Sequence, residues 1–208
     1  MARIETTDLH IPGAWELFPR IFDDDRGIFL EAFSAPELEA AIGIDFHVAQ
    51  ANLSVSSEGA LRGLHFADVP VGQAKVVSAV TGTVLDVIVD IRTGSPTFGD
   101  HVAVTLDSVR RNSVYVAEGL AHGFLALEPA CAVSYLVSSP YTPGAEHGIS
   151  PFDETIGVDW PAMALDGTVL DYVLSEKDRE APSLAELESA GALPRWEDCR
   201  TYLPGGRG

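Results

Sequence analysis

Three side chains with complementary chemistry lie close together in the sequence, in residues 59–66 and shortly after them. Arg62 carries a planar guanidinium that can bind a phosphate through two parallel hydrogen bonds. His65 can accept a proton near neutral pH, because the reference pKa of a histidine is ~6.5. Lys75 can stabilise an oxyanion as the negative charge develops. Together these groups are suited to removing a proton beside a carbonyl group of a phosphorylated substrate.

Two further residues are candidates for the same chemistry, each with an ordinary structural alternative. His122 lies between Ala121 and Gly123 at the start of a predicted strand, so it can face a pocket without crowding, or it can be a structural turn histidine. Tyr135 shares one face of a strand with Val133, because side chains alternate along a strand with period 2. A tyrosine in that position usually belongs to the core, with its hydroxyl satisfied. If it faces a cavity, Tyr135 can donate a proton.

The middle of the chain predicts the β-strands that would position these residues. Residues 75–80 and 83–91 are rich in valine and flank Thr81-Gly82, which predicts a β-hairpin. The second arm is nearly continuously apolar and predicts a buried strand, in which Asp86 and Asp90 need polar partners. Further short strands are predicted at residues 101–106, 113–116, 122–127 and 132–138. Short strands at a spacing of about 8–12 residues are typical of a β-sandwich or barrel.

Two short helices are predicted outside this strand-rich region. Ser34 and Glu37 have the spacing of a capping box that opens a helix, which Gly43 would end. Ser183 and Glu186 repeat the pattern near the C-terminus, with a glycine at position 191 as the stop. The predicted fold class is all-β, a double-sheet jelly roll with short helices in the N- and C-terminal regions. We expect residues 1–208 to form a single domain, with the core jelly roll at about 45–160 and a C-terminal helical extension at about 161–208.

Composition limits the class of protein and its location. The chain has 208 residues, of which 46% are hydrophobic, which fits one domain with a sizeable core. No apolar run approaches the ~18 residues of a transmembrane span, and the polar N-terminus lacks the apolar region of a secretory signal. The only cysteines, Cys131 and Cys199, do not make a disulfide framework. We therefore expect a protein of the reducing cytoplasm, without a membrane partner.

The net charge of −18 predicts a chain that repels nucleic acid. An anionic substrate would therefore need a local cluster of positive charge, because screening limits repulsion to about 8 Å at physiological salt. Arg26, Arg62, Lys75 and Lys177 are the candidates for such a cluster. The histidines are widely spaced and form no His-x-His or His-x-x-x-His pair, so no metal site is predicted. Phosphate-binding glycine loops and the nucleophile elbow of hydrolases are also missing from the sequence.

A series of short motifs follows in order from about residue 12 to residue 200. These motifs occupy residues 25–31, 50–54, 61–65, 73–75, 89–99, 121–124, 141–146, 159–161 and 174–178. In this order they resemble the motifs of the dTDP-4-dehydrorhamnose 3,5-epimerases, a family of the cupin superfamily. The resemblance implies a cupin-like jelly roll and an enzyme without metal or cofactor. It also implies a homodimer that exchanges N-terminal strands, and inversion of C3 and C5 of dTDP-4-dehydro-6-deoxy-D-glucose to give dTDP-4-dehydro-L-rhamnose.

The resemblance further implies a role for individual residues. His65 would be the base, with Asp178 as the carboxylate that orients it, and Tyr135 would be the opposing acid. Lys75 would stabilise the enolate at the C4 oxygen. Arg62 and His122 would line the same pocket. The remaining matches, at positions that hold the nucleotide or shape its site, are Arg26, Phe29, Glu31, Gln50, Asn52, Tyr141, Glu146 and Lys177.

The sequence departs from the family pattern near the proposed sugar site. Phe66-Ala67 stands where the family often has glutamine, and Leu136 follows Tyr135 where many members have lysine. A longer segment, residues 162–173, precedes the last motif. These departures leave open whether C3, C5 or both are inverted. The alternatives are a single-centre epimerase of an antibiotic deoxysugar pathway, a metal-dependent cupin oxygenase, and a sugar-nucleotide-binding protein without catalytic activity.

Overall fold

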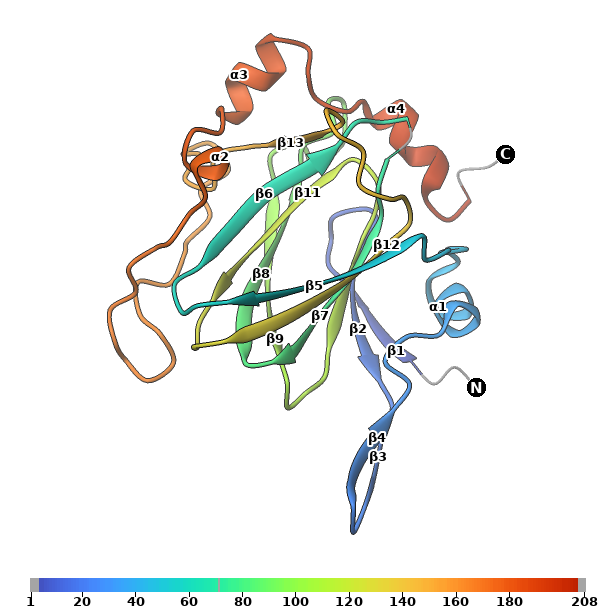
Figure 1. The fold of residues 1–208 in the computed structure, drawn as a ribbon. Helices are drawn as coiled ribbons and strands as arrows, with labels where there is room; N and C mark the ends of the chain where they lie inside the picture. The colour runs from blue at the N-terminus through green and yellow to red at the C-terminus, as the bar shows by residue number, and fades with distance from the viewer. Residues whose placement is uncertain (1–3, 71, 206–208) are drawn as a thin grey trace.

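Two antiparallel β-sheets face each other in the computed structural model, which describes residues 4–70 and 72–205 (Figure 1). The larger sheet contains, in spatial order, β1 (Ile4–Asp8), β2 (Ala14–Pro19), β10 (Ser113–Val116), β7 (Lys75–Thr81), β12 (Cys131–Val137) and β5 (Gln50–Ser56). The other sheet contains β13 (Glu146–Gly148), β6 (Leu61–Ala67), β11 (Leu120–Ala126), β8 (Thr83–Asp90) and β9 (His101–Asp107). A separate hairpin of β3 (Ile21–Asp24) and β4 (Gly27–Leu30) projects away from both sheets. The predicted all-β, double-sheet jelly roll is confirmed.

The predicted hairpin of residues 75–80 and 83–91 is wrong, because its two arms belong to different sheets. β7 pairs with β10 and β12, whereas β8 pairs with β11 and β9. The chain crosses between the sheets at Gly82, whose φ is +78°. A Cβ atom at this position would lie 2.7 Å from the sulfur of Cys131, so the corner requires glycine. Two valine-rich strands joined by a short turn fit a hairpin and a corner equally well, and the sequence pattern does not separate them.

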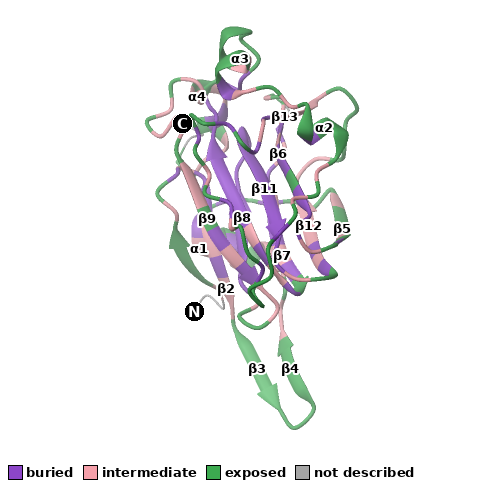
Figure 2. Ribbon diagram, turned by 90° about the vertical axis from the view of Figure 1, so that its left-hand side faces the viewer, coloured by how far each residue is buried: buried purple, intermediate pink, exposed green. Residues whose placement is uncertain are grey.

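The five-stranded sheet is covered on both faces, as the burial colours in Figure 2 show for β8 and β11. On the inner face, Val84 and Ile88 pack in the core between the sheets. On the outer face, Val87 and Val89 pack in a second cluster with residues of the C-terminal third, including Trp160. A strand covered on both faces needs apolar residues at nearly every position, which explains the composition of β8.

The remaining predicted elements are largely confirmed. β9, β10, β11 and β12 match the predicted strands, with ends shifted by no more than two residues. The four N-terminal strands were not predicted, because most residues of β1, β3 and β4 are exposed and give no apolar alternation. The helix α1 (Ala35–Ile42) ends at Gly43 as predicted, but the side chain of Ser34 makes no capping hydrogen bond. The capping box predicted at Ser183 is present in α3 (Leu184–Ser189).

The C-terminal region is tied to the five-stranded sheet by a buried ion pair. Arg92 and Asp90 are both fully buried and bond at 2.7 Å, and the guanidinium of Arg92 lies over the ring of Trp196, 4.7 Å from its centroid. Ser95 and Thr97 also donate hydrogen bonds to Asp90, so the predicted need of this aspartate for partners is met. The contact with Trp196 fixes α4 (Trp196–Cys199), which continues into the 3-10 turn η1 (Arg200–Tyr202). Within the described residues, no helix has the length and apolar character needed to cross a membrane.

Candidate active site

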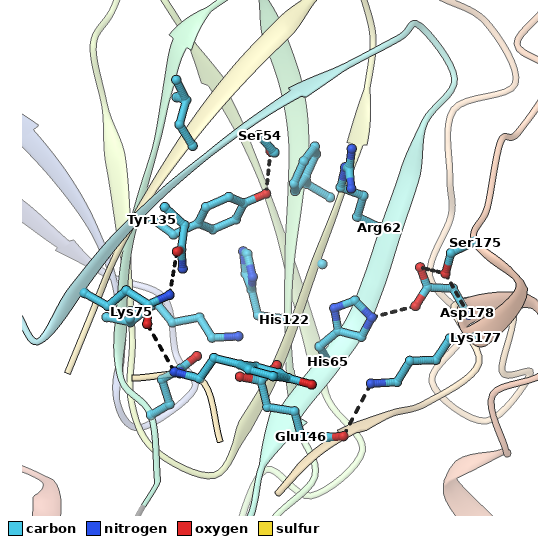
Figure 3. Close-up of a pocket in the computed structure, with 18 residues that line it drawn as sticks. Ser54, Arg62, His65, Lys75, His122, Tyr135, Glu146, Ser175, Lys177 and Asp178 are labelled. Carbon is cyan, nitrogen blue, oxygen red and sulfur yellow. Dashed lines mark hydrogen bonds and ion pairs between the residues drawn. The ribbon is translucent and has the colours of Figure 1, made fainter. Parts of the chain in front are cut away.

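A cavity of about 510 Å³ lies between the two sheets (Figure 3). Strands β5, β7 and β12 of the larger sheet contribute to its wall, as do β6, β11 and β13 of the smaller sheet and the short helix α2 (Glu176–Arg179). All four predicted catalytic residues line this cavity, although Asp178 lies 113 residues from His65 in the chain. The predicted binding residues that line it as well are Gln50, Asn52, Arg62, His122, Tyr141, Glu146 and Lys177.

His65 and Asp178 form a hydrogen-bonded pair on one side of the cavity. Nε2 of His65 lies 2.5 Å from Oδ1 of Asp178, whose side chain is only 6% exposed. Burial alone would raise the pKa of Asp178, but hydrogen bonds from His65, Ser175 and the backbone amide of Gly63 outweigh it and hold the pKa below its ordinary value. Asp178 is therefore a carboxylate at neutral pH. It accepts a hydrogen bond from Nε2–H of His65, which leaves Nδ1 as the nitrogen that can take a proton.

Helix α2 places Asp178 where it can reach His65. Ser175 is the N-cap of this helix, and its hydroxyl accepts a hydrogen bond from the backbone amide of Asp178 at 3.1 Å. The same hydroxyl lies 2.8 Å from Oδ2 of Asp178 and donates to it. The carboxylate is thus held on both oxygens, by the serine and by His65.

Tyr135 lies on the opposite sheet, on β12. Its hydroxyl is 2.8 Å from Oγ of Ser54, and its ring lies 6.2 Å from that of Phe124, centroid to centroid. Burial raises the pKa of Tyr135 to about 12, although the hydrogen bond with Ser54 and the positive charge of Arg62 act in the other direction. Tyr135 is therefore protonated at neutral pH and has a proton to donate.

Lys75 and His122 also line the cavity. Burial lowers the pKa of Lys75, and the nearby carboxylates of Glu146 and Asp86 oppose the shift. Nε2 of His122 lies 2.8 Å from Oδ2 of Asp86, and both side chains are almost fully buried, so the predicted need of Asp86 for a partner is met. His122 pairs with His65 in the register of β11 and β6, and the two histidine–aspartate pairs are therefore neighbours on one wall.

Other polar groups that line the cavity bond to one another. Gln50 donates to the side-chain oxygen of Asn52 at 2.6 Å and accepts from the backbone amide of Tyr141 at 3.2 Å. Nζ of Lys177 donates to the backbone carbonyl of Glu146 at 3.3 Å. An aromatic ring beside amide, carboxylate and ammonium groups can bind a base, a ribose and a phosphate.

Arg26, Phe29 and Glu31 are not brought into the cavity of their own chain. Arg26 and Phe29 belong to the β3–β4 hairpin, which extends into solvent in Figure 2, and Glu31 follows it directly. The side chain of Arg26 is 89% exposed and bonds to Asp24, while Phe29 is 66% exposed. Within one chain, the predicted binding residues therefore fall into two separate groups.

Several cavity residues were missed at the sequence level. Ser54, which contacts Tyr135, and Ser175, which contacts Asp178, had no predicted role, and neither did Gln73, whose side-chain amide donates to the carbonyl of Ser139. The alternation of polar residues along β5 could have revealed Ser54, because Gln50 and Asn52 precede it at even spacing. Over the described ranges, 4–70 and 72–205, no three histidine, cysteine or acidic side chains are grouped as a metal site requires.

Comparison with known proteins gives one consistent result. The model of the dTDP-4-dehydrorhamnose 3,5-epimerase family matches residues 8–186. A dTDP-4-dehydrorhamnose 3,5-epimerase of Mycolicibacterium smegmatis is 48% identical over 196 residues, covering 94% of this chain and 94% of the relative. The solved rmlC epimerase of Mycobacterium tuberculosis matches with a TM-score of 0.90 at 48% identity, covering 95% of this chain and 97% of that one. ChmJ, a 3'-monoepimerase from Streptomyces bikiniensis solved with dTDP-quinovose, matches with a TM-score of 0.85 at 43% identity. The match covers 91% of this chain and 93% of ChmJ.

Proposed function

The chain belongs to the dTDP-4-dehydrorhamnose 3,5-epimerase family, and we propose that it inverts C3 and C5 of dTDP-4-dehydro-6-deoxy-D-glucose to give dTDP-4-dehydro-L-rhamnose. The chain is an isomerase by this membership. One observation carries the mechanism: His65, paired with Asp178, and Tyr135 line the same cavity from opposite sheets. A base on one face of a sugar and an acid on the other face are what inversion of a carbon centre requires.

The first step of the proposed mechanism is removal of a proton next to the 4-keto group, which acidifies the hydrogens on C3 and C5. Nδ1 of His65 takes the proton, and the carboxylate of Asp178 fixes the tautomer and stabilises the imidazolium that forms. Lys75 stabilises the oxygen of the enolate, a contribution that is typically ~3–4 kcal/mol for one well-placed donor.

The second step is protonation of the same carbon from the other face. Tyr135 donates this proton, since its raised pKa keeps it protonated until the enolate is formed. The carbon is thereby inverted, and the enolate returns to the ketone. General acid–base catalysis of this kind typically contributes ~10²–10⁴-fold to the rate.

The nucleotide would bind to Tyr141 and the polar groups that line the cavity with it. Tyr141 would stack on the base, while Gln50, Asn52 and Glu146 would hold polar groups of the base and the ribose. Lys177 and Arg62 would bind the diphosphate, so that positive charge is local in a chain of net charge −18. The complex of ChmJ with dTDP-quinovose supports a nucleotide sugar as the ligand of this fold.

A homodimer would bring the missing binding residues into place. β5 is an edge strand of its sheet, and Leu53 and Val55 on it are 64% and 63% exposed. The β3–β4 hairpin carries Phe29, also largely exposed. If the hairpin of one subunit covers β5 of its partner, the apolar residues of both are buried. Arg26, Phe29 and Glu31 would then reach the partner's cavity, which β5 borders.

The proposal includes a cytoplasmic location. Its support is that Cys131 and Cys199 are both free and buried, as in proteins of a reducing compartment.

The test is a proton NMR time course of dTDP-4-dehydro-6-deoxy-D-glucose with the protein in deuterated water. Loss of both the C3 and the C5 proton signals, with formation of the L-rhamno product, is the expected result. Loss of one signal would reveal a single-centre epimerase, and loss of neither would refute the proposed activity. His65→Ala should abolish exchange at both carbons, and normal exchange in this variant would show that His65 is not the base.

A further inference from the structure

The edge strand β5 carries a row of polar side chains, of which Gln50, Asn52 and Ser54 line the cavity. Gln50, Asn52, Ser54 and Ser56 share one face of the strand, because side chains alternate along it. Oγ of Ser54 lies 2.8 Å from the hydroxyl of Tyr135, and Oγ of Ser56 accepts a hydrogen bond from Nε of Arg62 at 3.0 Å. Figure 3 shows Ser54 at the end of the Tyr135 side chain, joined to its hydroxyl. Ser54 is thus the neighbour through which the proposed acid can exchange its proton.

Two inversions with one base and one acid require the proton states to be reset between them. This requirement rests on the proposed function. After the first inversion, His65 has gained a proton from carbon and Tyr135 has lost one, so the pair is an imidazolium and a phenolate. The second inversion needs a neutral imidazole and a phenol again. Some group must therefore return a proton to the oxygen of Tyr135 while the sugar is still bound.

We propose that Ser54 relays a proton from water to the phenolate of Tyr135 between the two inversions, as a positioning residue for the acid. The phenolate oxygen takes the hydroxyl proton of Ser54 as Ser54 takes a proton from a water molecule. The imidazolium of His65 releases its proton to the resulting hydroxide, so no net proton is gained or lost. Ser54 is suited to this role because it lines the cavity, from which a water molecule can reach it, and its hydroxyl contacts that of Tyr135.

The chemistry of Tyr135 gives the relay a strong driving force. Its burial disfavours the phenolate, and the positive charge of Arg62, an exposed residue, offsets this effect only in part. Neither a serine hydroxyl nor water is acidic enough to protonate this phenolate alone. The proton released by the imidazolium of His65 therefore drives the net transfer along the relay, because the reference pKa of a histidine is only ~6.5. A hydrogen bond to a charged oxygen is also stronger than one between neutral groups, so Ser54 holds the phenolate in place while the proton arrives.

The relay is tested by the products of Ser54→Ala in deuterated water, with full-length protein in excess over substrate. The first inversion needs only the phenol already present, so deuterium should enter one carbon at close to the wild-type rate. The second inversion should slow by about 10- to 100-fold, and singly inverted sugar should accumulate. Ser54→Thr keeps a hydroxyl and should restore the wild-type ratio of double to single inversion. The matched control is Ser134→Ala, on the opposite face of β12 from Tyr135, which should behave as wild type.

Each other outcome overturns a defined statement. A wild-type ratio of double to single inversion in Ser54→Ala would refute the relay and leave the proposed function standing. The relay would also be refuted if Ser54→Ala slowed both inversions equally and Ser54→Thr did not restore them. A purely structural role of the serine would explain that result. If the wild type inverts one carbon only, Tyr135 must regain its proton, and His65 must lose one, between successive turnovers. Ser54→Ala must then show a burst of one turnover followed by slow turnover, and its absence would refute the relay. No exchange in the wild type would refute the proposed function and the relay together.

Discussion

Replacing Asp178 with asparagine tests the pairing on which His65, the proposed base, depends. The carboxylate lies 2.5 Å from Nε2 of His65 and is 6% exposed, while the side chain of His65 is 35% exposed. An asparagine of the same shape can turn its amide N–H groups toward Nε2. His65 would then carry its proton on Nδ1, the nitrogen that should act as the base. The substitution therefore removes a negative charge next to the imidazolium and favours the wrong tautomer.

The expected loss follows from these two effects. Two unit charges about 4 Å apart interact by ~4 kcal/mol at an effective dielectric constant of about 20. Because His65 is partly exposed, we expect about half of this value or more to be realised, which is about 2–4 kcal/mol and corresponds to a fall in kcat of about 30- to 1000-fold. KM should change little, since the side chain of Asp178 is almost fully buried and bonds to His65 and Ser175.

The assay is the rate of deuterium entry at C3 and C5, measured by NMR at saturating substrate. Glu176→Gln is the matched control, because Glu176 lies on the same helix, is exposed and does not line the cavity. Circular dichroism of both variants checks that the fold is retained. An Asp178→Asn variant with kcat within threefold of wild type would refute the assignment of Asp178 as the partner of the base.

Four further outcomes are expected. Tyr135→Phe should retain deuterium exchange from the face of His65 while losing inversion by about 10²–10⁴-fold, which chiral analysis of the product would detect. Asp90→Asn should lower the free energy of unfolding in urea by about 3–5 kcal/mol, because it leaves Arg92 buried without its charge partner. Phe29→Ala should raise KM severalfold while leaving kcat close to the wild-type value, as expected of a residue that lies outside the cavity of its own chain and serves the partner's cavity. The pKa of Asp178 is lowered on folding, so its stabilisation is present above about pH 4 and lost as the pH falls through the folded pKa. The difference in unfolding free energy between wild type and Asp178→Asn should therefore shrink below pH 4, as acid titration would show.

The sequence was informative where the chemistry is local. Arg62, His65 and Lys75 lie within fourteen positions, and β6 and β7 place all three in the same cavity. Tyr135 was placed by period-2 alternation, and Val133 beside it is indeed buried. The predicted partners for Asp86 and Asp90 exist because a charge in a strand covered on both faces must be neutralised or hydrogen-bonded.

The remainder depends on contacts between distant parts of the chain. Residues 174–178 have the local pattern of a polar loop, and Asp178 gained a role only through its resemblance to a known motif. The position of Gly82 shows the same limit, since a short turn between two apolar strands does not reveal which sheet each strand joins. Ser54 was missed because its role comes from contact with Tyr135, 81 residues further along the chain.

The two-sheet architecture itself explains how one cavity can support inversion. Stacked sheets lie about 10 Å apart, which is room for a sugar ring with one face toward each sheet. β6 of the five-stranded sheet carries His65, and β12 of the six-stranded sheet carries Tyr135. A base and an acid on one strand, or on neighbouring strands of one sheet, would approach the ring from the same side and could only exchange its protons. The placement of His65 and Tyr135 on opposing sheets therefore favours inversion over simple exchange, whichever of C3 and C5 reacts first.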